Sequence, residues 1–164
     1  MTEIVMLDDT EIVRIVMSYY EAVDSGDADR LADVYLASAT TTLKFNADDP
    51  IVSKEAIRAF SAQFFSMASV RHSQIDVWKT PLMGDVVPVE LAHPRGEGTL
   101  TVISTALPTF TLNSSGGPTE LPLPATSIFT IDLESGKLAS VHNMFDLGKV
   151  FAAAADPDPT SGRR

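Results

Sequence analysis

The chain has 164 residues, of which 45% are hydrophobic and 21% charged, values that are ordinary for one globular domain. Its 22 acidic and 12 basic side chains give a net charge of −10, which disfavours nucleic acid and anionic membrane surfaces as partners. Cysteine is absent, so disulfides, thiolate chemistry and cysteine metal sites are excluded.

The N-terminal segment is not expected to be a signal peptide. The N-terminus has no basic region followed by an apolar run, and no apolar run reaches the roughly 18 residues that a membrane span needs. We therefore expect a cytoplasmic protein. The pattern divides the chain into an N-terminal tail (1–7), one domain (8–155) and a flexible polar C-terminal tail (156–164).

Helical periodicity dominates the first third of the chain. Asp8 followed by Glu11 predicts a capping box at the start of a first helix, and Gly26 suits its end. Asp27 is placed to cap a second, short helix, and Ser53 a third. The apolar stripes of these helices are Ile12, Val16, Tyr19 and Val23, with Tyr20 beside them; Leu31, Val34 and Tyr35; and Ile57, Phe60, Phe64 and Met67.

The pattern then changes to period two, which is typical of strands. We expect a short strand over 40–45 and longer strands at about 70–79, 99–112, 123–133 and 137–146. The segment 81–98 is ambiguous, since 86–91 fits a short strand and His93 to Gly98 fits a mobile loop. Residues 147–155 are expected to form a closing helix.

Helices followed by long antiparallel strands are typical of an α+β fold with the helices on one face of the sheet. No βαβ alternation or glycine-rich phosphate loop is present, which disfavours nucleotide and dinucleotide cofactors. The sequence therefore predicts a curved sheet wrapped around amphipathic helices and enclosing one apolar pocket.

Strand parity picks out two polar residues in otherwise apolar rows. Ser127 stands among the odd positions of 123–133, and Asn143 among those of 137–146. A buried polar group without a partner costs roughly 1–3 kcal/mol, so each should bond a neighbour, a water or a ligand. A satisfied core contact and a ligand contact are both open for each residue.

A histidine is suited to general acid–base chemistry, and His72 opens the strand at 70–79. The face of His72 continues to Trp78. The opposite face carries Ile75 and Val77, and if that is the core face, His72 lies on a solvated or dimer surface. His142 is expected on the outer face, and three scattered histidines without ligand spacing argue against a metal site.

Two segments together suggest a family. The run 19–27 (YYEAVDSGD) leads into 31–35 (LADVY), and FTID at 129–132 leads through a Gly136 turn to Phe145 and Asp146. Over about residues 8–152 this order resembles the nuclear transport factor 2-like superfamily, and within it the SnoaL-like polyketide cyclases, ketosteroid isomerases and scytalone dehydratases. The resemblance implies a cone-shaped, mostly antiparallel sheet, a deep pocket and a homodimer through the outer sheet face, but the fold alone does not set the function.

The resemblance also implies roles for single residues. Tyr19 matches the tyrosine that donates to the substrate oxyanion in ketosteroid isomerases. Ser127 falls where those enzymes keep a protonated aspartic acid and the dehydratases an asparagine. Asn143 falls near the catalytic aspartate of the SnoaL-like cyclases.

Two positions depart from the family pattern. Leu43 lies where the isomerases keep their general-base aspartate, and a hydrocarbon cannot take a proton. Asp24 matches a dehydratase aspartate that pairs with a histidine on a central strand. The matching strand here, 99–107, has no histidine, so Asp24 also reads as a polar residue at a helix end.

The leading hypothesis is a cofactor-independent isomerase, cyclase or dehydratase of secondary metabolism, acting on a polyketide- or terpenoid-like molecule. Tyr19 would polarise a carbonyl, His72 would move the proton, and Asn143 and Ser127 would orient the substrate. The other expected substrate contacts are Asp24, Phe60, Phe64, Trp78, Phe129 and Phe145. No metal or cofactor is expected.

Two alternatives remain from the sequence. One is a non-catalytic small-molecule binder or dimeric assembly domain of the same fold, which the scarcity of ionisable pocket residues favours. The other is an epoxide-opening hydrolase, which needs interior carboxylates and an arginine that the sequence does not supply at recognisable places.

Overall fold

A computed structural model of the chain describes residues 8–79, 98–114 and 117–155. Its helices are α1 (Asp9–Ser25), α2 (Ala28–Asp33), α3 (Lys54–Met67) and α4 (Leu147–Ala155). Its strands are β1 (Thr42–Phe45), β2 (Ile51–Val52), β3 (Ala68–Lys79), β4 (Thr99–Ser114), β5 (Gly117–Pro122), β6 (Ala125–Asp132) and β7 (Leu138–Met144). The expectations for both tails, for most of the segment 81–98 and for His93 lie outside the described residues.

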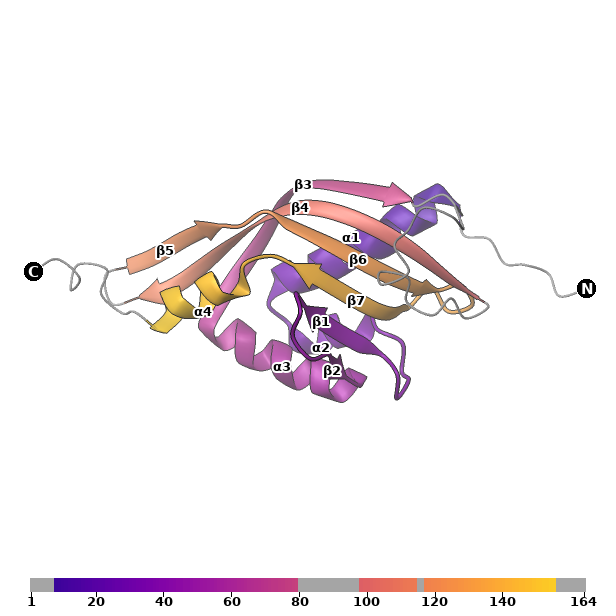
Figure 1. The fold of residues 1–164 in the computed structure, drawn as a ribbon, viewed down its shortest axis with the longest axis horizontal. Coiled ribbons are helices and arrows are strands. Elements are labelled where there is room, and N and C mark those ends of the chain that lie inside the picture. Colours follow the sequence, from indigo (N-terminus) through magenta and orange to yellow (C-terminus); the bar gives the residue numbers. More distant parts are fainter. Residues whose placement is uncertain (1–7, 80–97, 115–116, 156–164) are drawn as a thin grey trace, which may run out of the picture.

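The predicted α+β class is confirmed (Figure 1). Seven strands form one curved sheet in the order β2-β1-β7-β6-β4-β3, with β5 paired to the far end of β4. All pairs are antiparallel except β1 with β7. The sheet stays open, and α1, α2 and α3 lie against its concave face (Figure 1).

The predicted helix starts are also confirmed, because each depends on local hydrogen bonds. The Asp8 carboxylate accepts the N–H of Glu11 at 2.8 Å, and the Glu11 carboxylate accepts the N–H of Asp8 at 3.1 Å. Asp27 and Ser53 cap α2 and α3. α1 ends at Gly26, whose φ of 67° is the left-handed conformation that glycine adopts most easily.

The sequence pattern does not predict two of the strands. β2 has only two residues, and β5 begins and ends beside prolines, Pro118 and Pro122, in an exposed segment. β5 nevertheless pairs with β4 from Thr109 to Ser114, whereas the first half of β4 pairs with β6. This hairpin extends the sheet beyond the helices, toward the end of the molecule where α4 lies (Figure 1).

The core lies between α1 and the concave face of the sheet. Its fully buried side chains include Val16 of α1, Phe129 of β6 and Tyr35, which follows α2. A second cluster, containing Phe64, Phe110 and Val150, packs beneath α4. Among the described helices, none is long and apolar enough to span a membrane.

A bulge in β3 decides which of its side chains face the core. The register with β4 shifts between Ser73 and Asp76, and Gln74 takes a φ of 50°. A bulge adds one residue to a strand, so the side-chain alternation changes face across it. His72, before the bulge, faces inward, and Ile75 and Val77, after it, also pack against the core.

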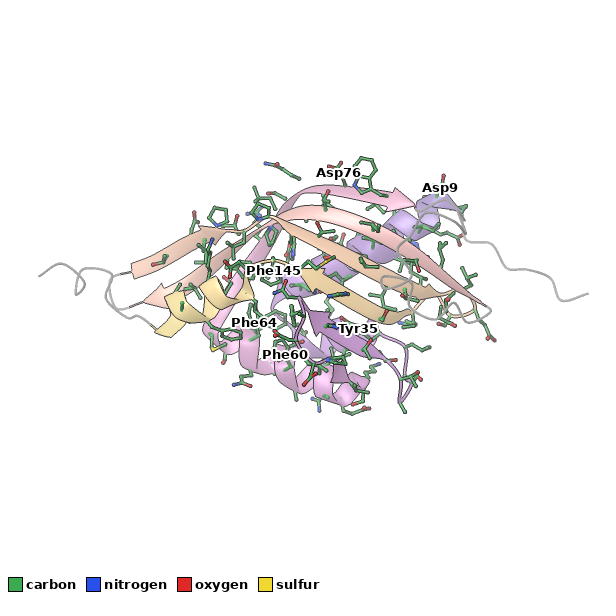
Figure 2. The ribbon with its side chains drawn as sticks, in the orientation of Figure 1. Asp9, Tyr35, Phe60, Phe64, Asp76 and Phe145 are labelled. Atoms are coloured by element: carbon green, nitrogen blue, oxygen red, sulfur yellow. The ribbon has the colours of Figure 1, made fainter. Side chains whose placement is uncertain are left out.

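The bulge corrects the predicted position of Trp78. Parity without a bulge puts Trp78 on the face of His72, but the Trp78 side chain is 59% exposed and does not line the pocket. Asp76 likewise lies on the outer side of β3, whereas Phe60, Phe64 and Phe145 lie between the sheet and the helices (Figure 2). Ile75 and Val77 therefore face the core as the second alternative required, but its consequence, that His72 lies on a solvated or dimer surface, is wrong.

The core assignment predicts a large difference between two apolar positions. Phe129→Ala should lower the free energy of unfolding by about 3–5 kcal/mol, because it removes a fully buried ring. Val13→Ala, at a residue of α1 that is 43% exposed, should change it by less than about 0.5 kcal/mol. Urea unfolding of both variants measures this, and a loss for Phe129→Ala as small as that for Val13→Ala would contradict the described core.

Candidate active site

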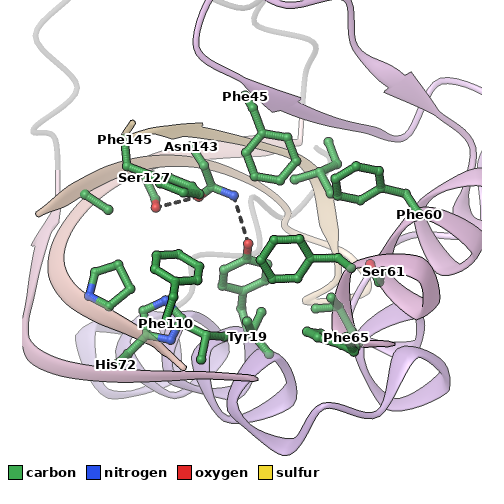
Figure 3. Close-up of a pocket in the computed structure, with 17 residues that line it drawn as sticks. Tyr19, Phe45, Phe60, Ser61, Phe65, His72, Phe110, Ser127, Asn143 and Phe145 are labelled. Atoms are coloured by element: carbon green, nitrogen blue, oxygen red, sulfur yellow. Dashed lines mark hydrogen bonds between the residues drawn. The ribbon is translucent and has the colours of Figure 1, made fainter. Parts of the chain in front are cut away.

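An apolar pocket opens on the concave side of the sheet, between α1, α3 and the strands (Figure 3). Six of the eight phenylalanines of the chain line it. These are Phe45, Phe60, Phe64, Phe65, Phe110 and Phe145. The cavity is narrow, with a volume of about 60 Å³, whereas pockets for small molecules usually measure about 300–1,000 Å³.

Five of these rings form a closed circuit of contacts. Phe45 packs on Phe60 at 5.4 Å between ring centroids, Phe60 on Phe64 at 6.4 Å and Phe64 on Phe110 at 6.0 Å. Phe110 then packs on Phe145 at 5.4 Å, and Phe145 returns to Phe45 at 5.9 Å. All five spacings fall in the range of favourable aromatic pairs. The apolar part of the wall is therefore a mutually supporting set of rings from α3, β1, β4 and the segment after β7.

A row of polar side chains crosses the sheet beneath α1. Ser104 of β4 is the register partner of Ser127 of β6, which is in turn the partner of Asn143 of β7. All three side chains are buried. The adjacent α1 residues Tyr19 and Tyr20 reach this row, and the five buried polar groups form two hydrogen-bonded branches.

The branch through Tyr19 faces the pocket. The Ser127 hydroxyl donates to Oδ1 of Asn143 at 2.6 Å, and Nδ2 of Asn143 donates to the Tyr19 hydroxyl oxygen at 2.9 Å (Figure 3). Because the Tyr19 oxygen accepts this bond, Asn143 does not use the Tyr19 proton. The neighbouring Tyr35, at 6.4 Å between ring centroids, carries a buried hydroxyl without a hydrogen-bond partner among the described residues. Burial raises the pKa of Tyr19 well above its ordinary value, with the Asn143 bond acting in the opposite direction, so the group is a neutral hydrogen-bond donor.

The branch through Tyr20 does not face the pocket. The Tyr20 hydroxyl donates to Ser104 at 2.9 Å, and the Ser104 hydroxyl donates to the backbone oxygen of Asp76 at 2.8 Å. Burial raises the pKa of Tyr20, and its bond with Ser104 opposes that shift. This branch ends on the backbone beside the bulge and is a structural contact.

His72 and Asp24 form a pair at the edge of the pocket. Nδ1 of His72 lies 2.6 Å from Oδ1 of Asp24, and the His72 backbone N–H lies 3.1 Å from both carboxylate oxygens. The His72 side chain is 9% exposed and that of Asp24 28%. Since a carboxylate accepts, Nδ1 is the donor in this contact, and Nε2 is the ring nitrogen that Asp24 does not engage.

The His72–Asp24 pair also explains how a negatively charged side chain is tolerated at the C-terminal end of α1. Asp24 lies in the last turn of α1, which has no basic residue, and a carboxylate there opposes the helix dipole by about 0.3–1 kcal/mol. The three hydrogen bonds from His72 offset this cost. The ring of His72 also packs on that of Tyr20, with 4.6 Å between centroids, so its orientation is fixed from two sides.

The structure brings most of the predicted site residues together. The residues that line the pocket are Tyr19, His72, Ser127, Asn143, Phe60, Phe64 and Phe145, and Leu43 lines it as a hydrocarbon. Asp24 lies behind His72 and does not line the cavity. Phe129 does not line it either; its ring packs edge-on against Tyr19 at 5.2 Å and supports the tyrosine from behind.

Sequence reasoning missed four residues of this region. Ser104 is the single hydroxyl among the even positions from 100 to 112, so the parity argument that found Ser127 would have found it. Phe110 lies in the same row. Phe45 ends a strand too short for a parity argument, and Phe65 lies beside the apolar stripe of its helix.

His142 lies outside the pocket, where its Nε2 donates to the backbone oxygen of Asn46 at 2.7 Å, in agreement with the predicted outer face. Within the described residues, no group of three or more histidine, aspartate or glutamate side chains is arranged to hold a metal ion.

Comparisons with known proteins identify the fold. Residues 12–97 match the sequence model of the nuclear transport factor 2 (NTF2) domain. A provisionally assigned polyketide cyclase of Xanthomonas campestris pv. campestris superposes with a TM-score of 0.63 at 16% identity, over 89% of this chain and 98% of that one. A ketosteroid isomerase-like protein of Erwinia carotovora atroseptica gives 0.60 at 14% identity, over 89% and 98%.

A third similar structure is named as an association domain. It is a provisionally assigned calcium/calmodulin-dependent protein kinase II association domain of Xanthomonas campestris, with a TM-score of 0.54 at 15% identity, over 85% of this chain and 89% of that one. No curated protein matches the sequence. At such identities the likeness establishes the fold and leaves the chemistry to the site.

From the buried tyrosines we expect the protein to unfold at alkaline pH. Burial raises the pKa of all three tyrosines of the chain, Tyr19, Tyr20 and Tyr35. The unfolded chain therefore releases its phenolic protons first, so this contribution to stability is complete below about pH 10 and is lost as pH rises further. Tyrosinate absorbance should rise in one step together with unfolding, and gradual ionisation of folded protein near pH 10 would contradict the described burial.

Proposed function

Because the chain belongs to the NTF2 domain family, we propose that its pocket catalyses a cofactor-independent proton transfer on a small hydrophobic carbonyl compound. The reaction class is isomerisation, cyclisation or dehydration. The observation that carries the proposal is the His72–Asp24 pair, with 2.6 Å between Nδ1 and Oδ1, in a pocket that is also lined by Tyr19, whose proton Asn143 does not use.

The proposed chemistry follows from the groups that are not already bonded. Tyr19 donates its proton in a hydrogen bond to the carbonyl oxygen of the ligand, and Nε2 of His72 takes a proton from the neighbouring carbon. The products of this step are an enolate bound by Tyr19 and an imidazolium bound by Asp24. Oriented donors in an apolar cavity stabilise such charge more strongly than water does.

The fate of the enolate defines the reaction class. Return of the His72 proton to another carbon is an isomerisation, and attack of the enolate carbon on a second carbonyl is a cyclisation. Loss of a hydroxyl from the next carbon, which takes the His72 proton and leaves as water, is a dehydration. In each case the imidazolium returns the proton that it took, so no cofactor is required.

The lining restricts the substrate. Among the described residues that line the pocket, none is lysine, arginine, aspartate or glutamate, so a charged ligand would lose its hydration without gaining a partner of opposite charge. A cavity of about 60 Å³ also requires phenylalanine side chains to turn before a ring enters. Phe60 and Phe145, which are only partly buried, are suited to do so. We therefore propose a neutral ligand with one or two rings.

A second candidate is a non-catalytic binder of the same ligands. The observation that favours it is that Ser127 and Asn143 are hydrogen bonded to each other, and Asn143 to Tyr19, without a ligand. Binding by this pocket without proton transfer is the outcome that would select it.

A homodimer through the outer sheet face belongs to the same proposal. Trp78 and Ile103 are register partners across β3 and β4 on that face, and Trp78 is 59% exposed. This row carries no carboxylate, so two copies of a chain with net charge −10 meet there with little repulsion.

Proton abstraction can be tested without knowing the substrate. In heavy water, the enzyme should exchange the protons beside the carbonyl of cyclohexanone, indanone or tetralone, followed by NMR. His72→Asn should slow exchange by about 10²–10⁴-fold and Tyr19→Phe by about 10²-fold. Asp24→Asn should cost about 10-fold or more, since it removes the charge that stabilises the imidazolium.

The chain supplies matched controls for this experiment. Tyr20→Phe removes a buried hydroxyl on the same helix but keeps the ring that packs on His72, and Val13→Ala changes an exposed residue of that helix; both should exchange as the wild type does. Equal exchange rates for Tyr19→Phe and Tyr20→Phe would contradict the proposed role of Tyr19 as the hydrogen-bond donor to the ligand. No exchange by the wild type above the rate of the denatured protein, together with bound indanone, would select the non-catalytic candidate.

The dimer is tested by light scattering. The wild type should have twice the mass of the chain, and Trp78→Glu should be monomeric because it places a charge at the exposed end of the apolar row. Val13→Glu, at an exposed position of α1, is the control and should remain dimeric. A wild-type monomer, or a dimer in Trp78→Glu, would contradict this interface.

A further inference from the structure

We infer that Asn46 is a positioning residue of the pocket, which holds Asn143 and Phe145 in place from outside the cavity. Asn46 directly follows β1 and does not line the pocket. Its effect on a ligand would therefore be exerted through the two residues that it binds.

Asn46 makes four hydrogen bonds to the end of β7. Its backbone N–H donates to the oxygen of Asn143 at 2.8 Å. Its side-chain Nδ2 donates to the oxygen of Phe145 at 2.7 Å, and the N–H of Phe145 donates to its Oδ1 at 3.1 Å. Its own oxygen accepts Nε2 of His142 at 2.7 Å.

The hydrogen bonds of Asn46 take the place of strand pairing beyond the point where the pairing of β1 with β7 ends. The parallel register of β1 with β7 ends at Phe45 and Asn143, and beyond it the chain leaves the sheet toward α4. The side-chain amide of Asn46 presents one donor and one acceptor to Phe145, as a backbone peptide group in a ladder would. The pairing thus extends to Phe145, two residues past the last register pair at Asn143.

Asparagine fits this position for two reasons at once. The φ of Asn46 is 49°, a left-handed conformation that asparagine adopts more readily than other residues with a Cβ. Glycine would adopt it more easily but has no amide. The need for both properties is the argument that the side chain acts on Phe145 and does not merely turn the chain.

The residues that Asn46 fixes are central to the site. Phe145 belongs to the circuit of aromatic rings, between Phe45 and Phe110. Asn143 holds the Tyr19 hydroxyl. Because a misplacement of about 1 Å in a site can cost about 10²-fold in rate, a residue that sets both the wall and the donor determines how ligands fit.

The test uses Asn46→Gly, which keeps the left-handed φ and removes the amide. Its readouts are hydrogen exchange of the Phe145 backbone N–H by NMR, and KM and kcat for proton exchange on indanone. We expect Phe145 N–H exchange to be at least about 10-fold faster, since that group loses its acceptor. KM should rise about 10-fold and kcat should fall less, because the wall is loosened more than the acid–base pair.

Two further variants separate positioning from general loosening. Asn46→Asp keeps the acceptor for the Phe145 N–H and loses the donor to its oxygen, so it should fall between Asn46→Gly and the wild type. Asp48→Ala, in the same exposed turn, makes no contact with Phe145 and should match the wild type. Equal changes in Asp48→Ala, or an unchanged Phe145 N–H and KM in Asn46→Gly, would overturn the inference.

The KM readout rests on the proposed function, but the Phe145 readout does not. If the wild type exchanges no ketone protons, the proposed function fails, and protection of the Phe145 N–H together with indanone affinity still decides the role of Asn46. Unchanged protection and unchanged affinity in Asn46→Gly would then overturn it.

Discussion

Two adjacent tyrosines on one helix have to be buried with their hydroxyl groups hydrogen bonded. Neighbouring residues of an α-helix point about 100° apart, so Tyr19 and Tyr20 reach different strands: Tyr19 reaches Asn143 of β7, and Tyr20 reaches Ser104 of β4. Ser127 lies between them on β6. A shift of one residue in either strand would turn its polar group to the outer face. The position of α1 and the register of three strands therefore depend on one another.

The bulge at Gln74 allows the buried polar row to coexist with His72 at the edge of the pocket. Without it, β3 could offer the interior either His72 or the pair Ile75 and Val77, but not both. One residue with a φ of 50° lets the first half of the strand serve the pocket and the second half the core. The Ser104 hydroxyl bonds the backbone of Asp76 just after the bulge, so the Tyr20 branch of the polar row also holds the bulge in place.

The features that the sequence predicts well are those set by local chemistry. Helix caps at Asp8, Asp27 and Ser53 need only neighbours along the chain, and the inward rows of β6 and β7 need only regular alternation, which also identifies Ser127 and Asn143. Trp78 was misplaced because a bulge interrupts alternation without a distinctive residue in the sequence. Asp24 and His72 are 48 positions apart, and nothing local to either residue shows that the end of α1 meets the edge of β3.

The same fold occurs in proteins named as cyclases and as an association domain, so function depends on which polar groups remain unbonded. In this pocket Ser127 and Asn143 are occupied by their neighbours, which leaves the proton of Tyr19 and Nε2 of His72. If Asp24 only accepted a hydrogen bond from the His72 backbone N–H, a neutral side chain with an acceptor oxygen would serve equally well. Asp24 instead places a full charge at the negative end of α1, with 28% of its side chain exposed. That charge is useful chiefly when the imidazole itself becomes charged, which is what a histidine that accepts a proton from a substrate has to do.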